Sequence, residues 1–495
     1  MEDAVFGTQR ERRRWMALAL VVTAQFMVIL DVTIVNVALP SIQRDLGFAQ
    51  ENLQWVITAY TIMFGGTLLL GGRLADLLGR RRLLVVGLAL FSFSSLLCGL
   101  AWSESSLIAF RGVQGLGAAL LVPAALALLM TTFTEGHERN LALGIYGAAA
   151  GSGAAVGVLL GGLLTTYLSW PWIFFVNVPV GSAAIAFTPL LLGESRAMLP
   201  HRHFDLAGAT SVTAGLMLLV YALTRATNDG WGATTTLALL TSSVALLLAF
   251  VAIELRSRAP LLPLRIFRLR ALSAANATIA VVGAGAFSEF FLLTLYMQDV
   301  LGFTPVQTGA AFAALALAAV VASNLVQAVV GRIGVRPVLT SGLLALSLSV
   351  ALLSRVPVEG HYFWDLFPAF LLGGAGLGVS FVSATIGGLT GVRPSDSGVA
   401  SGLVNTSRQI GGAIGLAAIS AVAAASAGSY ADSHPDVQAS SALALTHGFQ
   451  ISFYVLTGVL LFGALIAATL LKPRPPSLEA ERAYEQQPEP VREAA

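Results

Sequence analysis

The chain has 495 residues, of which 56% are hydrophobic and only 11% are Asp, Glu, Lys or Arg. Soluble domains carry about 25% charged residues, and so few charges cannot cover a water-facing surface. The composition therefore excludes an ordinary soluble enzyme, a nucleic-acid-binding protein and a disordered chain, and it predicts a polytopic membrane protein. The net charge of +2 says little by itself.

Rare residues exclude several further chemistries. The single cysteine, Cys98, cannot form an internal disulfide, and the single lysine, Lys472, lies in the C-terminal tail. A phosphate-binding loop and a Schiff-base cofactor both need a lysine near the site. The six histidines show no metal-ligand spacing. We therefore expect no ATP hydrolysis, no cofactor and no metal.

Long apolar runs follow one another along the chain, and most of them contain no charge. A membrane-spanning helix needs roughly 20 apolar residues, and these runs predict an all-α membrane protein with fourteen transmembrane helices. The runs cover residues 15–38, 52–70, 83–101, 106–130, 141–168, 172–193, 206–224, 235–255, 271–298, 306–330, 337–355, 364–390, 399–424 and 448–471.

The positive charges predict the orientation. With the N-terminus inside, 23 of the 28 Lys and Arg residues fall in cytoplasmic segments, three in outer loops, and Arg111 and Arg408 within spans. Positive loops stay in the cytoplasm, so we expect a multi-pass protein of the cytoplasmic membrane with both termini inside. The start is not a cleaved signal peptide, because its apolar run continues past Leu30 without a small-x-small site.

A weak internal repeat predicts two halves. The loops at 71–84 and 330–339 both have a Gly-Arg pair near their start, and they lie eight spans apart. This spacing fits two six-helix bundles with two inserted helices, and such repeats place the substrate site between the halves. The predicted divisions are a cytoplasmic N-terminus (1–14), an N-terminal bundle (15–193), a linker with inserted helices 7 and 8 (194–270), a C-terminal bundle (271–471) and a disordered cytoplasmic tail (472–495).

Four strings carry a family resemblance over nearly the whole chain. They are LDVTIVNVALPSIQRDLG (30–47), GGRLADLLGRRR (71–82), RGVQGLGAA (111–119) and GAAVGVLLGGLL with SWPWIFFVNVPVG (153–181). With fourteen spans and GVASGLVNTSRQIGGAIG (398–415), the sequence resembles the fourteen-span drug:proton antiporters of the major facilitator superfamily. Two departures concern the fourth motif, where Val158 replaces a usual proline and Pro171 a usual arginine. In the second motif, Leu77 stands at a basic position.

Three ionisable residues within spans are the expected proton-coupling groups. Asp31 lies in span 1, and a carboxylate there costs about 2.5–3.5 kcal/mol on insertion scales. Arg111 cannot lose its charge and needs a partner, with Gln114 one turn away. Glu289 is the only acid deep in the C-terminal bundle. The resemblance implies a proton-handling role, whereas a packing or capping role for Asp31, a hydrogen-bond hub for Arg111 and a buried structural carboxyl for Glu289 remain open.

The resemblance also implies a gate and a seal. The gating loop comprises Gly72, Asp76, Gly79, Arg80 and Arg81, although these arginines also serve as a topology signal. Small residues four apart let helices approach closely, so Gly153, Gly157, Gly161 and Gly162 are expected to pack span 5 and, by the resemblance, to seal the outward path.

Polar and aromatic side chains within spans are candidates for a substrate cavity. They are Phe26, Asn36, Gln114, Tyr60, Phe290, Tyr296, Asn405 and Arg408. Any single aromatic residue is more often core or lipid-facing, and a structural network with Asn405 and Gln409 is favoured for Arg408.

The expected function is export of amphipathic organic compounds (drugs, antibiotics or dyes) in exchange for protons. The expected partners are a small organic substrate, protons and the lipid bilayer, without nucleic acid or ATP, in a monomer. A selective metabolite or lipid exporter and an uptake symporter of the same fold remain alternatives. A non-transporting sensor or a membrane enzyme is a remote one, because the spans carry neither a nucleophile motif nor metal-ligand spacing.

Overall fold

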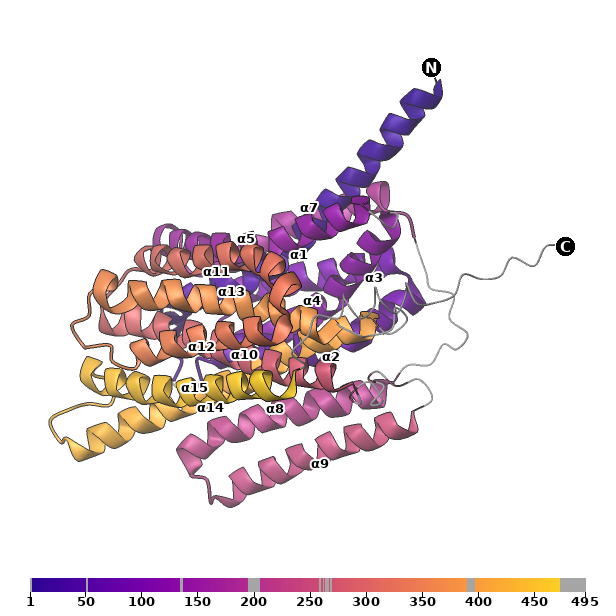
Figure 1. Cartoon of the computed structure of the whole chain (residues 1–495). Helices are drawn as coiled ribbons and strands as arrows, with labels where there is room; N and C mark the ends of the chain where they lie inside the picture. Colours follow the sequence, from indigo (N-terminus) through magenta and orange to yellow (C-terminus); the bar gives the residue numbers. More distant parts are fainter. Residues whose placement is uncertain are drawn as a thin grey trace.

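The computed structural model describes residues 2–49, 52–133, 137–194, 205–257, 260, 262, 267, 269–389 and 397–471. Every long regular element in these residues is a helix (Figure 1). In the N half the helices are α1 (Glu2–Leu46), α2 (Trp55–Leu78), α3 (Arg80–Gly99), α4 (Glu104–Thr132), α5 (His137–Tyr167), α6 (Trp172–Phe175) and α7 (Asn177–Leu191).

An inserted hairpin follows the N half, and the C half comes last. The hairpin consists of α8 (Leu206–Asp229) and α9 (Thr234–Arg256). The helices of the C half are α10 (Arg270–Leu295) with η2 (Tyr296–Val300), α11 (Pro305–Ile333), α12 (Val335–Leu353), η3 (Tyr362–Leu366) with α13 (Phe367–Leu389), α14 (Ser397–Ser433) and α15 (Ala442–Leu470).

The helices coincide with the predicted apolar runs. Among the described residues, eleven helices are long and apolar enough to cross a membrane, and shorter apolar stretches lie at Trp55–Leu68, Val156–Tyr167 and Ala207–Leu223. The all-helical membrane fold is confirmed, and the number fourteen stays a prediction. Three helices continue beyond the apolar runs, and the predicted division of the chain stays a prediction. Helix α1 begins at Glu2 within the segment expected to precede it, α14 extends to Ser433, and α15 begins at Ala442. The predicted tail lies outside the described residues.

Local sequence explains where several helices begin. Gly79 joins α2 directly to α3 with φ of 113°, a conformation that side-chain-bearing residues rarely adopt. Ser103 caps α4 and Thr304 caps α11, each in a reciprocal capping box with the residue three positions later. These caps fix the first turns of two helices that carry or border the site.

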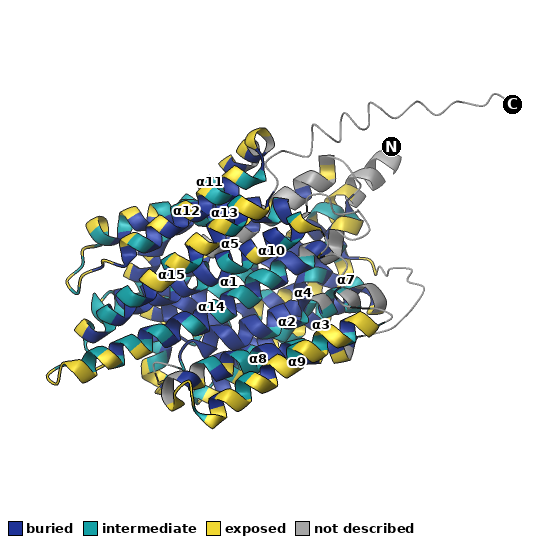
Figure 2. Cartoon of the chain, turned by 60° about the horizontal axis from the view of Figure 1, so that its bottom comes forward, coloured by how far each residue is buried: buried dark blue, intermediate teal, exposed yellow. Residues whose placement is uncertain are grey.

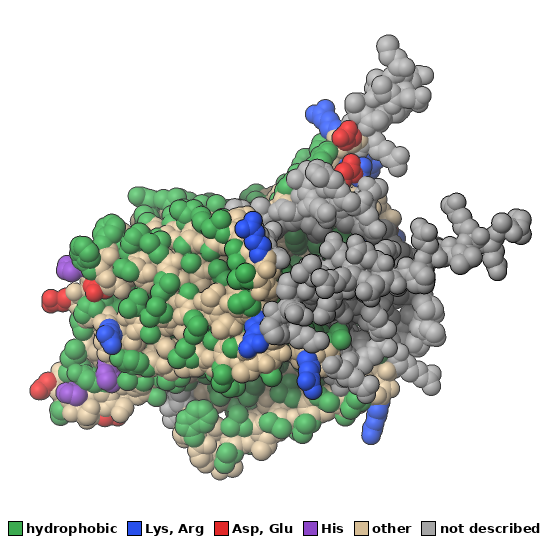
Figure 3. Space-filling view, in the orientation of Figure 1, with side chains coloured by type: hydrophobic (Ala, Val, Ile, Leu, Met, Phe, Trp, Pro, Cys, Tyr) green, Lys and Arg blue, Asp and Glu red, His purple; other side chains and the backbone are tan. Residues whose placement is uncertain are grey.

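The helices pack into two halves with the hairpin on one side. Helices α2, α3 and α4 contact one another in the N half. In the C half, α13 contacts α10, α11, α12 and α14, and the hairpin helix α8 lies against both α2 and α14. Buried residues fill the middle of the bundle, whereas α9 is largely exposed (Figure 2). On the face seen in Figure 3, charged side chains gather toward the ends of the helices and leave a mostly hydrophobic belt between them.

The two seams between the halves differ. At the α2–α14 seam, Trp55 and Ala59 of α2 form one apolar cluster with Leu216 of α8 and Ala417 of α14. At the α5–α11 seam the backbones meet directly. A Cβ added to Gly162 would lie 2.5 Å from the Pro305 carbonyl oxygen, and one added to Gly309 would collide with the Val158 carbonyl. The inserted hairpin therefore covers only one seam.

Candidate functional site

Asp31 lies at the centre of a buried polar network in the N half. Its Oδ2 accepts a hydrogen bond of 2.7 Å from Arg111 Nη1, which makes a salt bridge, and its Oδ1 accepts bonds from Gln114 Nε2 at 2.8 Å and Asn177 Nδ2 at 2.9 Å. The Asp31 side chain is 0% exposed and that of Arg111 is 1% exposed. Helices α1, α4 and α7 thus each supply part of one network.

The Arg111 guanidinium has further partners that hold it in place. Its Nε donates to the Val56 carbonyl at 2.9 Å, and its Nη1 also donates to Gln114 Oε1 at 2.6 Å. Its Cζ lies 4.4 Å from the centroid of the Tyr60 ring, a cation–π distance. The Tyr60 side chain is buried, but its hydroxyl has no hydrogen-bond partner among the described residues.

Sequence reasoning missed two members of this network, Asn177 and Ser95. Asn177 Nδ2 also donates to Ser95 Oγ at 3.1 Å, and Ser95 Oγ donates to the Phe174 carbonyl at 2.9 Å. Asn177 follows the WIFFV string that contributed to the family resemblance, so a signal was present. Nothing in the sequence pattern indicated that this amide would reach a residue 146 positions away.

The network can hold one negative charge in a low-dielectric environment. Three donors stabilise the ionised form of Asp31, and Arg111 supplies the countercharge. Removing either charge would leave the other buried without compensation. The arrangement therefore holds the Asp31 carboxyl group and the Arg111 guanidinium in a fixed position relative to each other.

Glu289 has the opposite environment in the C half. The residue is 0% exposed, and neither Oε1 nor Oε2 has a hydrogen-bond partner among the described residues. Gly373 of α13 makes room for the Glu289 carboxyl group. A Cβ added to Gly373 would lie 3.0 Å from Glu289 Oε1 and 2.7 Å from Ser349 Oγ. An ionised carboxylate without a partner is strongly disfavoured in such a site. The geometry favours the neutral acid.

The aromatic candidates of the C half lie in packed layers. Phe290 is half-buried and stacks on Phe312, with ring centroids 4.8 Å apart. Tyr296 is 0% exposed, and its hydroxyl donates to the Pro357 carbonyl at 2.6 Å. This contact ties Tyr296 to the loop between α12 and η3, away from the middle of the bundle. The hydroxyl group of Tyr296 is thus already bound in this conformation, and a place for its ring in a substrate cavity stays a prediction.

The remaining polar candidates lie on α1 and α14. Asn36 Nδ2 donates to the Val32 carbonyl at 2.9 Å, and its Oδ1 has no partner among the described residues. Phe26 is half-buried, and a Cβ added to Gly153 would lie 3.4 Å from its ring. On α14, Arg408 Nη2 donates to Asn405 Oδ1 at 3.0 Å. Arg408 and Gln409 form no hydrogen bond with each other, so of its two expected neighbours only Asn405 is hydrogen-bonded to Arg408.

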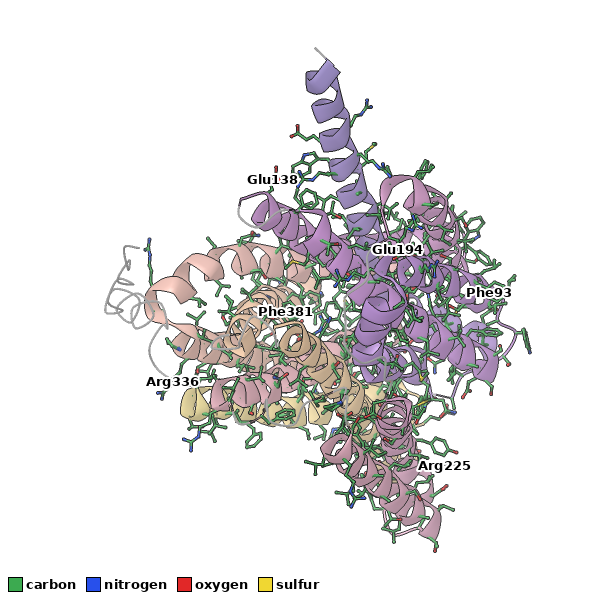
Figure 4. All side chains as sticks on the ribbon, turned by 90° about the vertical axis from the view of Figure 1, so that its right-hand side faces the viewer. Phe93, Glu138, Glu194, Arg225, Arg336 and Phe381 are labelled. Carbon is green, nitrogen blue, oxygen red and sulfur yellow. The ribbon has the colours of Figure 1, made fainter. Side chains whose placement is uncertain are left out.

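The predicted gating loop is held by a residue that the motif does not contain. Glu194, just beyond α7, accepts a bond of 3.1 Å from the Arg81 backbone N–H and lies 3.8 Å from both Arg81 Nε and Arg82 Nε. A Cβ on Gly79 would lie 2.6 Å from Glu194 Oε1. Figure 4 shows Glu194 among the helices of the N half. Arg80 is half-buried. The side chain of Asp76 lies outside the described residues.

The glycines show which close approaches the fold requires. Next to the gating loop, Gly71 and not Gly72 meets another backbone, that of Ala119 in α4, whereas a Cβ on Gly72 would make an ordinary contact with Pro123. On α5, three glycines face α1 and one faces α11. Gly153 packs against Ile29, Gly157 against Leu30 and Thr33, Gly161 against Ile34, and Gly162 against Pro305 and Val306.

Polar contacts join the two halves at one end of the bundle, where α1 ends and α2 begins. We call this the loop-47 end. Ser420 Oγ donates to Gln54 Oε1 at 2.6 Å, and Gln298 Nε2 donates to the Val37 carbonyl at 2.7 Å. Gly162 and Pro305 meet in the same layer. The structure is therefore closed at the loop-47 end.

Two helical halves that meet at one end, with buried ionisable groups in each, define a membrane transporter of the two-bundle class. Residues 21–416 match the family model described as Major Facilitator Superfamily. The chain belongs to the major facilitator superfamily, and it is a transporter rather than an enzyme.

Relatives and solved structures agree with this assignment. The chain is 41% identical to Puromycin resistance protein pur8 of Streptomyces alboniger, over 93% of this chain and 92% of that protein. It is also 41% identical to Cephamycin export protein CmcT of Amycolatopsis lactamdurans, over 81% and 84%. An auto-inhibited POT family peptide transporter shares the fold, with a TM-score of 0.68 and 16% identity, over 94% of this chain and 99% of that one.

Proposed function

We propose that this protein exports amphipathic organic compounds, including antibiotics, across the cytoplasmic membrane in exchange for protons. The similarity to proteins named for puromycin resistance and cephamycin export, over more than four fifths of the chain, supports export of such compounds. In this proposal the protein is a monomer with fourteen spans and both termini in the cytoplasm. The loop-47 end then faces outward, and the structure is closed on that side.

Proton coupling rests on one observation, the buried Glu289 with no partner on either oxygen among the described residues. A carboxyl that is neutral in this dry environment would lose its proton when water or substrate reaches it from the other side. Inward movement of each proton supplies about 2.3 kcal/mol per 100 mV of membrane potential. Glu289 is therefore the proposed carrier of the exchanged proton.

Asp31 and Arg111 have a different part in the proposal. Their network keeps its charges paired in the closed conformation, and it spans α1, α4 and α7. Opening at the loop-47 end would move these helices against the C half, with the tight α5–α1 glycine contacts and the gating loop guiding the movement. The network thus links the charge state of the N half to its conformation.

The test is transport by the purified protein in lipid vesicles. Vesicles that hold the cationic dye ethidium should lose it against its gradient when a pH gradient is imposed, and an uncoupler should stop this movement. Asp31→Asn and Glu289→Gln should abolish uphill movement. Glu359→Gln, which neutralises an exposed acid in the loop between α12 and η3, is the matched control and should transport normally.

The outcomes separate export from coupling. If the wild type moved neither ethidium nor any other organic dye, the export proposal would be wrong. If both acid variants transported as well as the wild type under a pH gradient, the coupling assignment would be wrong, while export would stand. Counterflow with single compounds separates a broad exporter from a selective one.

A further inference from the structure

Arg408 is a cation for which the described residues supply no counter-ion. It lies on α14, where its Cζ stands 5.0 Å from the centroid of the Phe381 ring and its Nη2 donates to Asn405 Oδ1. Its Nε has no hydrogen-bond partner, and no carboxylate pairs with it in the part of the chain that the structure describes. A guanidinium cannot shed its charge, so this site retains one positive charge.

The other buried charges do not compensate Arg408. Asp31 is paired with Arg111 in the N half, so that pair is neutral as a whole. Glu289 has its oxygens beside Gly373 and Ser349, whereas α10 approaches α14 through Gly283, which packs against the backbone of Arg408. An arginine in a membrane-embedded bundle normally has an acidic or polar partner. Among the described residues, Arg408 lacks such an acidic partner.

The Arg408 side chain borders the boundary between the two halves. The helices α2 and α14 meet there, since a Cβ on Gly65 would lie 2.8 Å from Gln409 Cβ. Phe381 of α13 is 40% exposed, and Figure 4 labels it among the helices of the C half. A guanidinium without an acidic partner among the described residues and a partly exposed ring therefore lie together beside the α2–α14 seam.

We propose that Arg408 is the subsite for an oxygen anion of the transported compound, a carboxylate or an ionised phenol carried on an apolar ring system. The Arg408 guanidinium binds the anionic oxygen, and Phe381 contacts the ring. This inference rests on the proposed export function and adds a substrate class to it.

Electrostatics gives the preference for an anion over a neutral molecule. A bound anion would neutralise a charge that has no partner in a low-dielectric site, and charge-assisted hydrogen bonds are about twice as strong as neutral ones. A neutral ester of the same ring system would keep the apolar contacts and lose this interaction. The predicted signature is thus selectivity between an acid and its ester.

The experiment uses 7-(diethylamino)coumarin-3-carboxylic acid and its ethyl ester, which share one fluorescent ring system. Binding is measured with the full-length protein in lipid nanodiscs, with empty nanodiscs as the blank. The wild type should bind the acid more tightly than the ester. Arg408→Gln should weaken acid binding about tenfold or more and leave ester binding unchanged. Arg408→Lys should keep part of the preference, and Arg355→Gln, which removes an exposed positive charge, should keep all of it.

Three results would overturn the subsite. They are equal binding of acid and ester by the wild type, an unchanged acid preference in Arg408→Gln, and a matching loss of both ligands in a variant that still melts like the wild type. None of these depends on proton-driven flux of ethidium, which tests the export proposal separately. A protein that moves ethidium but shows no acid preference would keep its proposed function and lose this subsite.

Discussion

Asp31 in the N half accepts hydrogen bonds from three side chains, whereas Glu289 in the C half has no partner on either oxygen among the described residues. The arginines differ in a similar way, since Arg111 forms a salt bridge with Asp31, whereas Arg408 has no acidic partner in the described part of the chain. The N half therefore keeps its charges in a fixed network. The C half holds a neutral acid and an uncompensated cation, each able to gain a partner when a proton leaves or a substrate arrives.

The largest expected effect comes from breaking the N-half pair. Arg111→Met should lower the free energy of unfolding by about 3–5 kcal/mol, because Asp31 would be left as a buried charge without a counter-ion. Denaturant unfolding in detergent micelles measures this. The double variant Asp31→Asn with Arg111→Met should recover part of the loss, and Arg355→Gln serves as the control. An Arg111→Met protein as stable as the wild type would contradict the fixed-network account.

A smaller effect is expected where the C half leaves room for its acid. Gly373→Ala should cost about 1–3 kcal/mol, because the new methyl group would press on Glu289 and Ser349. Gly458→Ala in α15 is a matched helical control with no atom within 4 Å of the added Cβ. It should be neutral or slightly stabilising. Equal melting of the two variants would show that the space beside Glu289 is not tightly filled.

The contacts at the loop-47 end test whether the halves separate there. Ser420→Ala removes the hydrogen bond to Gln54, which is worth about 1 kcal/mol, so the population open at this end should rise about fivefold. Spin labels on cysteines introduced at Asn52 and Gly428, in a Cys98→Ser background, would report the distance distribution. Thr457→Ala removes a hydrogen bond within α15 and serves as the control. An unchanged distribution would argue against a gate at this contact.

The smallest effect on stability is expected at Glu289 itself. Glu289→Gln should change the free energy of unfolding by less than about 1 kcal/mol, because one neutral group replaces another of similar shape. Asp31→Asn should cost clearly more, since it leaves Arg111 uncompensated. Both are measured by the same denaturant unfolding. The comparison between the halves would fail if Glu289→Gln were the more destabilising of the two.

Periodicity and composition were sufficient to predict where the helices lie, but they did not predict the contacts among the helices. Each predicted apolar run falls on a helix, because hydrophobicity over some 20 residues is a local property. The pairing of Asp31 with Arg111 and Gln114 was anticipated only as a need for partners. Asn177 and Glu194 were missed, because their contacts join residues more than a hundred positions apart. The bond between the Tyr296 hydroxyl and the Pro357 carbonyl was not anticipated either, because no sequence pattern shows where an aromatic ring on a buried helix points.

The most direct test of the central claim is proton release on substrate binding. Purified protein in a weakly buffered detergent solution, with a pH-indicator dye, is titrated with a transported compound. If Glu289 carries the exchanged proton, the wild type should release protons as the compound binds, and Glu289→Gln should bind the compound and release none. Equal proton release from Glu289→Gln and the wild type would contradict the account.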